Sequence, residues 1–161
     1  AREDEQYKVA KVVEKVYDCF VIRSAELYLN KAEAEAMLDK AEAKQTIKTL
    51  LNNRFEGGIP DVDGLNEKDL ISFIRDERRR ELCFEAHRWF DLRRYAVSSK
   101  YPEKKSIRHE TYDKNGVLEG DYVLKPYGED PAWVLPIPGY EIVYNQGNLV
   151  DNPQRVERKL E

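Results

Sequence analysis

Arginine and carboxylate side chains alternate along residues 75–94, in spacings that can bring them together on one helix. Residues three apart on a helix are neighbours, so an acid and an arginine at that spacing can pair. Such pairs are Arg78 with Glu81, Glu85 with Arg88, and Asp91 with Arg94. A 3.6-residue period puts Arg78 and Glu85 on one stripe with Trp89, where a charge without a partner is very costly. We therefore predict a structural charge network of seven residues: Glu77, Arg78, Glu81, Glu85, Arg88, Asp91 and Arg94.

Two of these carboxylates, Glu81 and Glu85, also have the residue types of a catalytic pair. A glycoside hydrolase uses two carboxyl groups, one of which must hold a proton near neutral pH. Neighbouring arginines lower the pKa of a carboxyl group, which is the opposite of what a general acid needs. No catalytic residue is therefore predicted, and a carboxylate-dependent glycoside hydrolase stays an alternative function.

Neither a metal site nor a cofactor is predicted. His87 and Asp91 lie four residues apart and could supply two ligands, but the only other histidine is His109 and no third ligand is apparent. Cys19 and Cys83 each lie in an apolar stretch, outside any CxxC or Cys/His cluster. We expect two buried thiols with no disulfide between them.

The balance of charge argues against a nucleic-acid partner. The 161 residues include 27 Lys or Arg and 31 Asp or Glu, for a net charge of −4. Even along residues 75–94 the arginines alternate with acids and do not form a basic face. A content of 41% hydrophobic residues is enough for a core, and no apolar run approaches the roughly 18 residues of a membrane-spanning helix. The length predicts a single domain over residues 1–161.

The first part of the chain, up to about residue 96, is predicted to be a helical layer. Residues 24–38 place Ala and Leu on one face with no Gly or Pro, which indicates a helix. A second helix is expected to begin at Asp39, in a capping box with Glu42, and to run to about Phe55. Two helices with so short a linker form a tetratricopeptide-like hairpin.

The third helix is expected over about residues 67–95, capped by Asn66 with Asp69, and is the longest element. It carries the whole charge network. Residues 1–22 have apolar positions that fit both a helix and a strand, so their conformation is left open.

The remainder, about residues 97–161, is predicted to be a layer of loops and short strands. Six of the ten Tyr and six of the seven Pro lie from Tyr101 onward, whereas all five Phe lie at or before Phe90. The pair Asn115-Gly116 predicts a type I′ β-hairpin. Tyr and Trp rings in such loops offer flat faces on which a sugar ring can stack. The fold class is therefore mainly α, with a helical hairpin, a long helix and a loop-rich part that contains a β-hairpin.

Four blocks of residues, in order, resemble the SusD/RagB family of outer-membrane nutrient-binding lipoproteins. The blocks are Ile22-Arg23-Ser24-Ala25-Glu26-Leu27-Tyr28-Leu29-x-x-Ala32-Glu33-Ala34, Leu50-x-x-x-Arg54, Glu77-Arg78-x-x-Glu81-Leu82-x-Phe84-Glu85-x-x-Arg88-Trp89-x-Asp91-Leu92-x-Arg94, and Leu135-Pro136-Ile137-Pro138-x-x-Glu141-Ile142-x-x-Asn145 with Asp151-Asn152-Pro153. The family usually ends in Gln-Asn-Pro-Gly, so Asp151 and Gln154 depart from its pattern. The resemblance implies the C-terminal portion of a longer protein, whose lipid-bearing N-terminal part is absent here.

The resemblance also implies a function. Members of the family lie on the outer-membrane surface over a SusC-like TonB-dependent transporter and capture glycans for import without cleaving them. No sugar-contacting residue follows from the motifs. The loop-rich part supplies the candidates, with Trp133 and Tyr127 favoured on a loop stiffened by Pro and Gly, together with Tyr112 and Tyr122. A helical interaction scaffold without sugar binding stays a further alternative.

Overall fold

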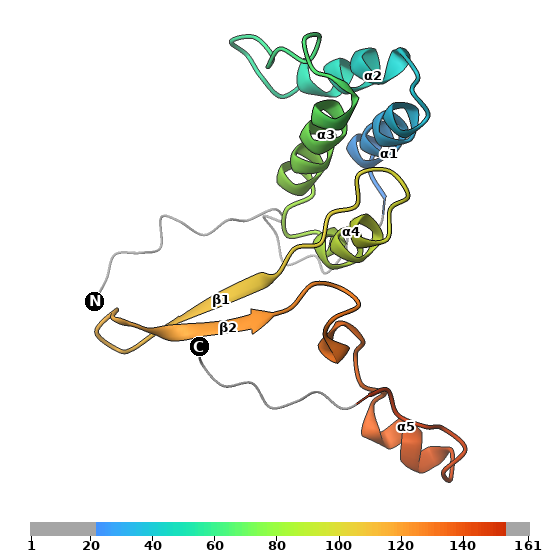
Figure 1. Ribbon diagram of the computed structural model, residues 1–161, viewed down its shortest axis with the longest axis vertical. Coiled ribbons are helices and arrows are strands. Elements are labelled where there is room, and N and C mark those ends of the chain that lie inside the picture. Colours follow the sequence, from blue (N-terminus) through green and yellow to red (C-terminus); the bar gives the residue numbers. More distant parts are fainter. Residues whose placement is uncertain (1–21, 154–161) are drawn as a thin grey trace, which may run out of the picture. The chain divides into compact units, whose positions relative to one another are not determined.

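The computed structural model describes residues 22–153, and the predicted fold class is confirmed: the chain is mainly helical with one small antiparallel sheet (Figure 1). The elements are α1 (Ser24–Met37), α2 (Glu42–Leu51), α3 (Glu67–Glu81), α4 (His87–Ala96), β1 (Ile107–Tyr112), β2 (Leu118–Leu124) and α5 (Gly139–Tyr144). The chain divides into two compact units, and the boundary between them along the sequence falls within α4, between Trp89 and Phe90. The single-domain interpretation stays a prediction.

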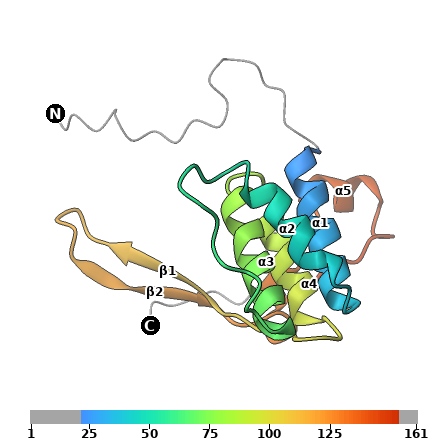
Figure 2. The same ribbon diagram turned by 90° about the horizontal axis from the view of Figure 1, so that it is seen from above.

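The first unit is built on the predicted helical hairpin. The helices α1 and α2 pack together and α3 packs on α1 (Figure 2). Small side chains on α1 let the helices approach closely, and branched side chains from α2 and α3 fill the space between them. The buried apolar residues of these helices are Ala25, Leu29, Ala32 and Ala36 of α1, Ala43, Ile47, Leu50 and Leu51 of α2, and Leu70, Ile71 and Ile74 of α3.

The predicted capping box of α2 is wrong, because Asp39 ends α1 instead of starting α2. Asp39 is left-handed with φ 55°, and the amides of Asp39 and Lys40 donate to the carbonyls of Ala36 and Glu35. Those two bonds make a Schellman ending, which satisfies carbonyls that a helix terminus leaves free. The N-cap of α2 is Ala41, which makes no side-chain cap bond, and the helix itself ends at Leu51 with turns beyond it.

The start of α3 is as predicted. The Asn66 side chain accepts a hydrogen bond from the Asp69 amide at 2.9 Å, and its own amide group donates to the Asp69 carboxylate. The loop before it is held against α2, since the Lys44 ammonium group donates to the carbonyls of Asp63 and Leu65.

The predicted long helix is wrong, since it is broken between Glu81 and His87. Phe84 and Ala86 are left-handed, with φ values of 63° and 62°, a conformation that costs an L-residue roughly 1–2 kcal/mol. The sequence has no Gly or Pro there to signal the break. The compensation is tertiary: the Arg23 guanidinium donates to the Glu81 carbonyl oxygen at the end of α3 and to the Glu85 carboxylate.

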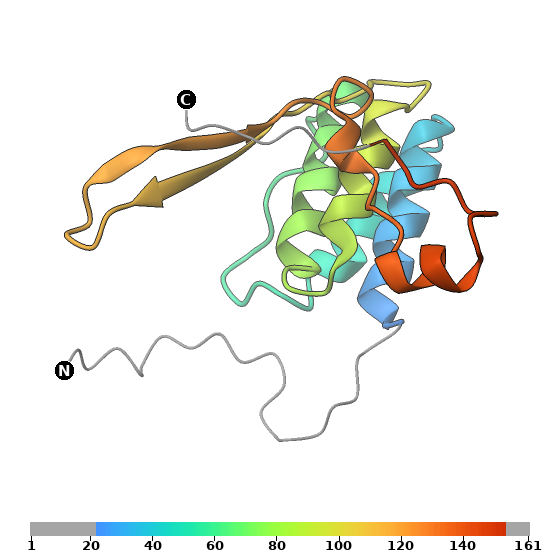
Figure 3. The same ribbon diagram turned by 90° about the horizontal axis from the view of Figure 1, so that it is seen from below.

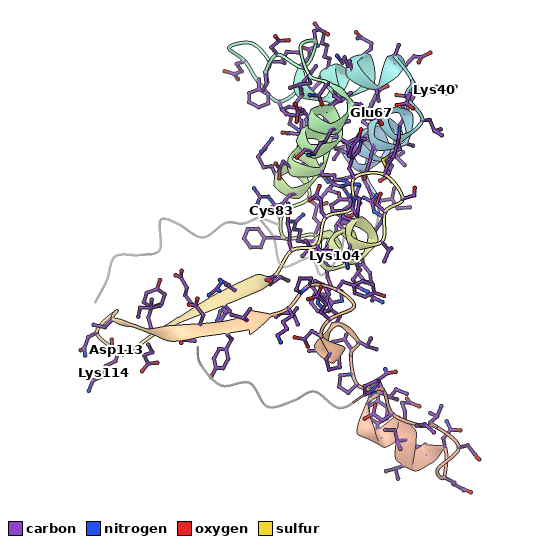
Figure 4. The ribbon with its side chains drawn as sticks, viewed as in Figure 1. Lys40, Glu67, Cys83, Lys104, Asp113 and Lys114 are labelled. Carbon is purple, nitrogen blue, oxygen red and sulfur yellow. The ribbon has the colours of Figure 1, made fainter. Side chains whose placement is uncertain are left out.

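The connection between α3 and α4 also exposes Cys83, which is a free cysteine (Figure 4). The expectation of a buried thiol at this position is wrong, because the apolar stretch around Cys83 lies in this connection, where Phe84 is exposed as well. Cys19 and the open assignment of residues 1–21 lie outside the described residues. Within residues 22–153, no helix has both the length and the apolar content to cross a membrane.

The second unit begins with the last residues of α4 and continues as hairpin, loop and short helix (Figure 3). Tyr95 and Trp133 are its most deeply buried side chains, each 1% exposed. Trp133 closes a short 3₁₀-helix, Pro131–Trp133. Asp130 caps this 3₁₀-helix by accepting from the Ala132 amide at 2.9 Å.

The β-hairpin is confirmed, but its turn type is wrong. The Gly116 amide donates to the Asp113 carbonyl and the Asp113 amide to the Val117 carbonyl, which leaves a loop of three residues. Only Gly116, with φ 82°, is left-handed in that loop, whereas a type I′ turn needs two such residues. Figure 4 shows Asp113 and Lys114 at this end of the hairpin.

The last family-like block closes a loop that carries α5. The Asp151 carboxylate accepts from the Ile137 amide at 2.9 Å, and the Asn152 side chain donates to the Leu135 carbonyl at 2.7 Å. A carboxylate serves as this acceptor as well as an amide oxygen would, so the departure from the family pattern at Asp151 leaves the turn intact.

Candidate functional site

Trp133, the favoured stacking residue, is not exposed. Only 1% of its surface is open to solvent, and its indole N–H donates to the Lys125 carbonyl at 2.7 Å. A ring in this position has no free face for a ligand. The expectation of an exposed Trp133 is therefore wrong, because the ring fills the core of the second unit.

Tyr127 lies against Trp133 and is half-buried. The two ring centroids are 5.9 Å apart with the planes at 85°, an edge-to-face contact, and the Arg93 guanidinium lies 5.2 Å from the Tyr127 centroid. Such contacts each contribute on the order of 1 kcal/mol and fix the orientation of the ring. The predicted neighbours Tyr127 and Trp133 are thus brought together, with Trp133 as the support.

Tyr112 and Tyr122 lie on opposite faces of the hairpin. Tyr122 is directly opposite His109, and side chains of paired residues share a face. Tyr112 is three residues from His109 along β1 and therefore lies on the other face, since successive side chains alternate. The irregularity of the ladder falls on the β2 side, where Gly120 and Leu118 oppose the consecutive residues Thr111 and Tyr112. The two rings cannot enclose one sugar between them.

Tyr112 is 55% exposed and its hydroxyl donates to the Glu110 carboxylate. That hydrogen bond is the main cause of a raised pKa of Tyr112, because a nearby carboxylate disfavours the phenolate. The bond also confirms that Tyr112 shares a face with Glu110.

Glu81 is the centre of the charge network, and its partners come from far away in the sequence. Arg54 donates to both of its carboxylate oxygens at 2.9 Å, and Arg23 donates to one of them at 2.5 Å. Arg23 also donates two hydrogen bonds to the Glu85 carboxylate, at 2.8 and 3.0 Å. The sequence predicted arginine partners for Glu81 and Glu85 and named Arg78 and Arg88, three residues away on the same helix. The arginines that donate to them here are Arg54 and Arg23, from outside that helix.

The pKa of Glu81 falls from an ordinary value of 4.5 to about 2, chiefly because of the Arg54 hydrogen bonds, with Arg23 adding to the effect against the opposing cost of burial. Glu81 therefore stays ionised at any physiological pH. A group of this kind cannot donate a proton as a general acid.

Two other members of the network, Glu77 and Asp91, pair locally. Arg80 donates to Glu77 at 2.7 Å and Arg94 to Asp91 at 3.1 Å, both three residues apart. Arg78 reaches across to α1, where its guanidinium donates to the Asn30 side chain at 2.7 Å. Arg88 is half-exposed.

Lowering the pH is expected to remove the contribution of Glu81 to stability. Because the folded state holds the Glu81 pKa below its unfolded value, this contribution is complete above pH 4.5 and is lost as the pH falls towards about 2. Urea unfolding at several pH values should show the gap between wild type and Glu81→Gln shrinking through that window. Glu56→Gln, at an exposed position, is the control and should show no comparable gap at pH 7. A Glu81→Gln gap that is constant from pH 7 to 2 would contradict the assignment.

Comparison with known proteins decides the family. The model of the SusD family matches residues 8–154, which is most of the chain. The chain belongs to the SusD family. It is similar to two SusD-like proteins of Formosa agariphila: P2, at 28% identity over 82% of this chain and 25% of P2, and P38, at 40% identity over 45% of this chain and 16% of P38.

A solved SusD-like carbohydrate binding protein from Bacteroides vulgatus has a similar fold. Its TM-score is 0.51 at 24% identity, over 80% of this chain and 29% of that chain. This SusD-family chain therefore spans 16% to 29% of the length of the relatives named here.

The SusD-family blocks of the sequence meet in the charge network. Arg23 comes from the first block, Arg54 from the second, and Glu81 and Glu85 from the third. Helical spacing could not indicate either arginine, because it relates only residues of one helix and both arginines lie outside the helix of Glu81. The signal that could have found them is the presence of an arginine in each of the two shorter blocks.

Proposed function

We propose that this chain is part of a cell-surface lipoprotein of the outer membrane that captures a polysaccharide or oligosaccharide and delivers it to a SusC-like TonB-dependent transporter. The observation that carries the proposal is the match of the SusD family over residues 8–154. The similar fold in Bacteroides vulgatus belongs to a protein named for carbohydrate binding, which supports the same ligand class.

Within the described chain, the candidate glycan contacts are tyrosines of the second unit. They are Tyr122, which exposes 39% of its surface, and the half-buried Tyr127. Tyr112, the remaining candidate from the sequence, is left out of these contacts because its hydroxyl is already bound to the Glu110 carboxylate. A pyranose ring presents C–H groups that pack on an aromatic plane. Trp133 acts in this proposal by holding the ring of Tyr127 and not by touching sugar.

Capture without cleavage fits the chemistry of the carboxylates better than hydrolysis does. Glu81 and Glu85 bind arginines of their own unit, and the pKa of Glu81 is about 2. The glycoside-hydrolase alternative would need one of them protonated near neutral pH. A helical scaffold without sugar binding is the remaining alternative.

Two assays on the 161-residue chain test the proposal. Native electrophoresis in gels that contain single polysaccharides should show retarded migration in at least one of them. Incubation with the same polysaccharides should release no reducing ends. Sustained release that Glu81→Gln or Glu85→Gln abolishes would favour a hydrolase, and free migration in every gel would favour the scaffold.

A further inference from the structure

We propose that one face of the β1–β2 hairpin, the one that carries Tyr122 and His109, is the part of this chain on which neutral sugar rings stack. The inference rests on the proposed function and names a binding surface and ligand class for it. It follows from the register of the two strands, which sorts their side chains into two chemically different faces.

Among the paired residues of the described hairpin, those on the Tyr122 face include no carboxylate, arginine or lysine. Pairing of His109 with Tyr122, Thr111 with Gly120, and Ile107 with Leu124 places these residues together on one side of the sheet. Their side chains are imidazole, phenol, hydroxyl and hydrocarbon. A surface of this composition suits an uncharged ligand, because a charged ligand would find no opposite charge on it.

The opposite face is charged and its charges pair with one another. Arg108, Glu110 and Asp121 lie on it, and the Arg108 guanidinium donates to Asp121 at 2.7 Å. Glu110 accepts the hydroxyl of Tyr112. The aromatic residue of this face therefore already has its hydroxyl bound to a carboxylate, whereas the described residues paired on the Tyr122 face include no carboxylate.

The Tyr122 face also has a position without a side chain next to its aromatic ring. Gly120 is two residues from Tyr122 on β2, so the next position along the same face has no side chain. A sugar ring that stacks on Tyr122 can extend over this bare backbone. Tyr122 is 39% exposed, and His109 opposite it is exposed as well.

Polar groups that can form hydrogen bonds with sugar hydroxyls lie on the same face, around Gly120. His109 offers ring nitrogens that donate or accept, and the Tyr122 hydroxyl can do both. Thr111 uses its hydroxyl hydrogen on the Gly120 carbonyl at 3.0 Å, which fixes its oxygen as an acceptor at the edge of the bare strand. An aromatic plane with a few fixed polar groups is the usual composition of a site for small neutral ligands.

The hairpin supplies its own matched control, because it carries one tyrosine on each face. Wild type, Tyr122→Ala and Tyr112→Ala are compared in native gels that contain neutral amylopectin, xyloglucan or galactan, or anionic alginate or polygalacturonate. The affinity for the best neutral polysaccharide is then measured by titration calorimetry. Amide NMR spectra of the three chains verify that the hairpin remains formed.

Tyr122→Ala should weaken neutral binding by roughly tenfold, the effect of losing one aromatic stacking contact, and Tyr112→Ala by less than twofold. Equal weakening by both variants, a larger effect of Tyr112→Ala, or wild-type binding to the anionic polysaccharides alone overturns this inference while leaving glycan capture standing. A wild-type chain that binds none of the five polysaccharides overturns both.

Discussion

Glu33→Leu is expected to lower the free energy of unfolding by about 3–5 kcal/mol. Glu33 on α1 and Arg75 on α3 form an ion pair at 3.3 Å, with 6% and 3% of their side-chain surfaces exposed. Removing the carboxylate leaves a guanidinium buried between two helices, and a buried charge cannot recover its hydration there. The large effect is thus the cost of burying the Arg75 charge without the Glu33 carboxylate.

A double-mutant cycle separates that cost from the value of the pair itself. Arg75→Met should destabilise by a similar amount, and the double variant Glu33→Leu/Arg75→Met by much less than the sum, because it removes both charges of the buried pair. Urea unfolding followed by far-UV circular dichroism measures all four chains. Lys31→Met is the control on the same helix, since Lys31 is exposed and the loss of its 3.7 Å pair with Glu35 costs at most about 1 kcal/mol. Additive single effects would show that the two charges do not depend on each other.

Trp133→Ala is expected to destabilise the second unit by about 3–5 kcal/mol, the usual cost of truncating a fully buried aromatic ring. The substitution opens a cavity beside Tyr127 and leaves the Lys125 carbonyl without the indole N–H at 2.7 Å. Hydrogen exchange of the amides in β1 and β2, measured by NMR, reports on this unit directly. Their protection should fall strongly in Trp133→Ala.

Trp133→Phe is the matched variant, because it keeps a ring and loses only the N–H donor and part of the volume. We expect it to cost about 1–2 kcal/mol, from the lost hydrogen bond and a smaller cavity. If Trp133→Ala left exchange in the hairpin unchanged, the ring would not be the centre of this unit, and its buried position would be in doubt.

The sequence by itself determined the local elements of this protein. The Ala and Leu positions of residues 24–38 predicted α1 to within one residue of its end, and Asn66 with Asp69 predicted the start of α3. It also predicted that Glu81 and Glu85 must have arginine partners, since a charged residue on an apolar stripe is costly without one. The SusD family could be recognised for the same reason, because its blocks are runs of neighbouring residues.

Only the tertiary structure decided where the long charged helix stops. The apolar period runs through residues 82–86 without interruption, and Phe84 and Ala86 are poor residues for the left-handed conformation that they adopt. The guanidinium of Arg23, 58 residues before Glu81, donates to the Glu81 carbonyl at the end of α3. A local pattern cannot contain that contact.

The tertiary structure likewise decided which aromatic rings are available to a ligand. Trp133 and Tyr122 both read as stacking residues in the sequence, but one fills a core and the other lies on an open strand. The separation of Tyr112 from Tyr122 depends on one residue of register in the hairpin. Burial and register arise from contacts between residues that are distant in the sequence. The type and spacing of the residues therefore determine which groups need partners. Only the folded chain determines which partners these groups find.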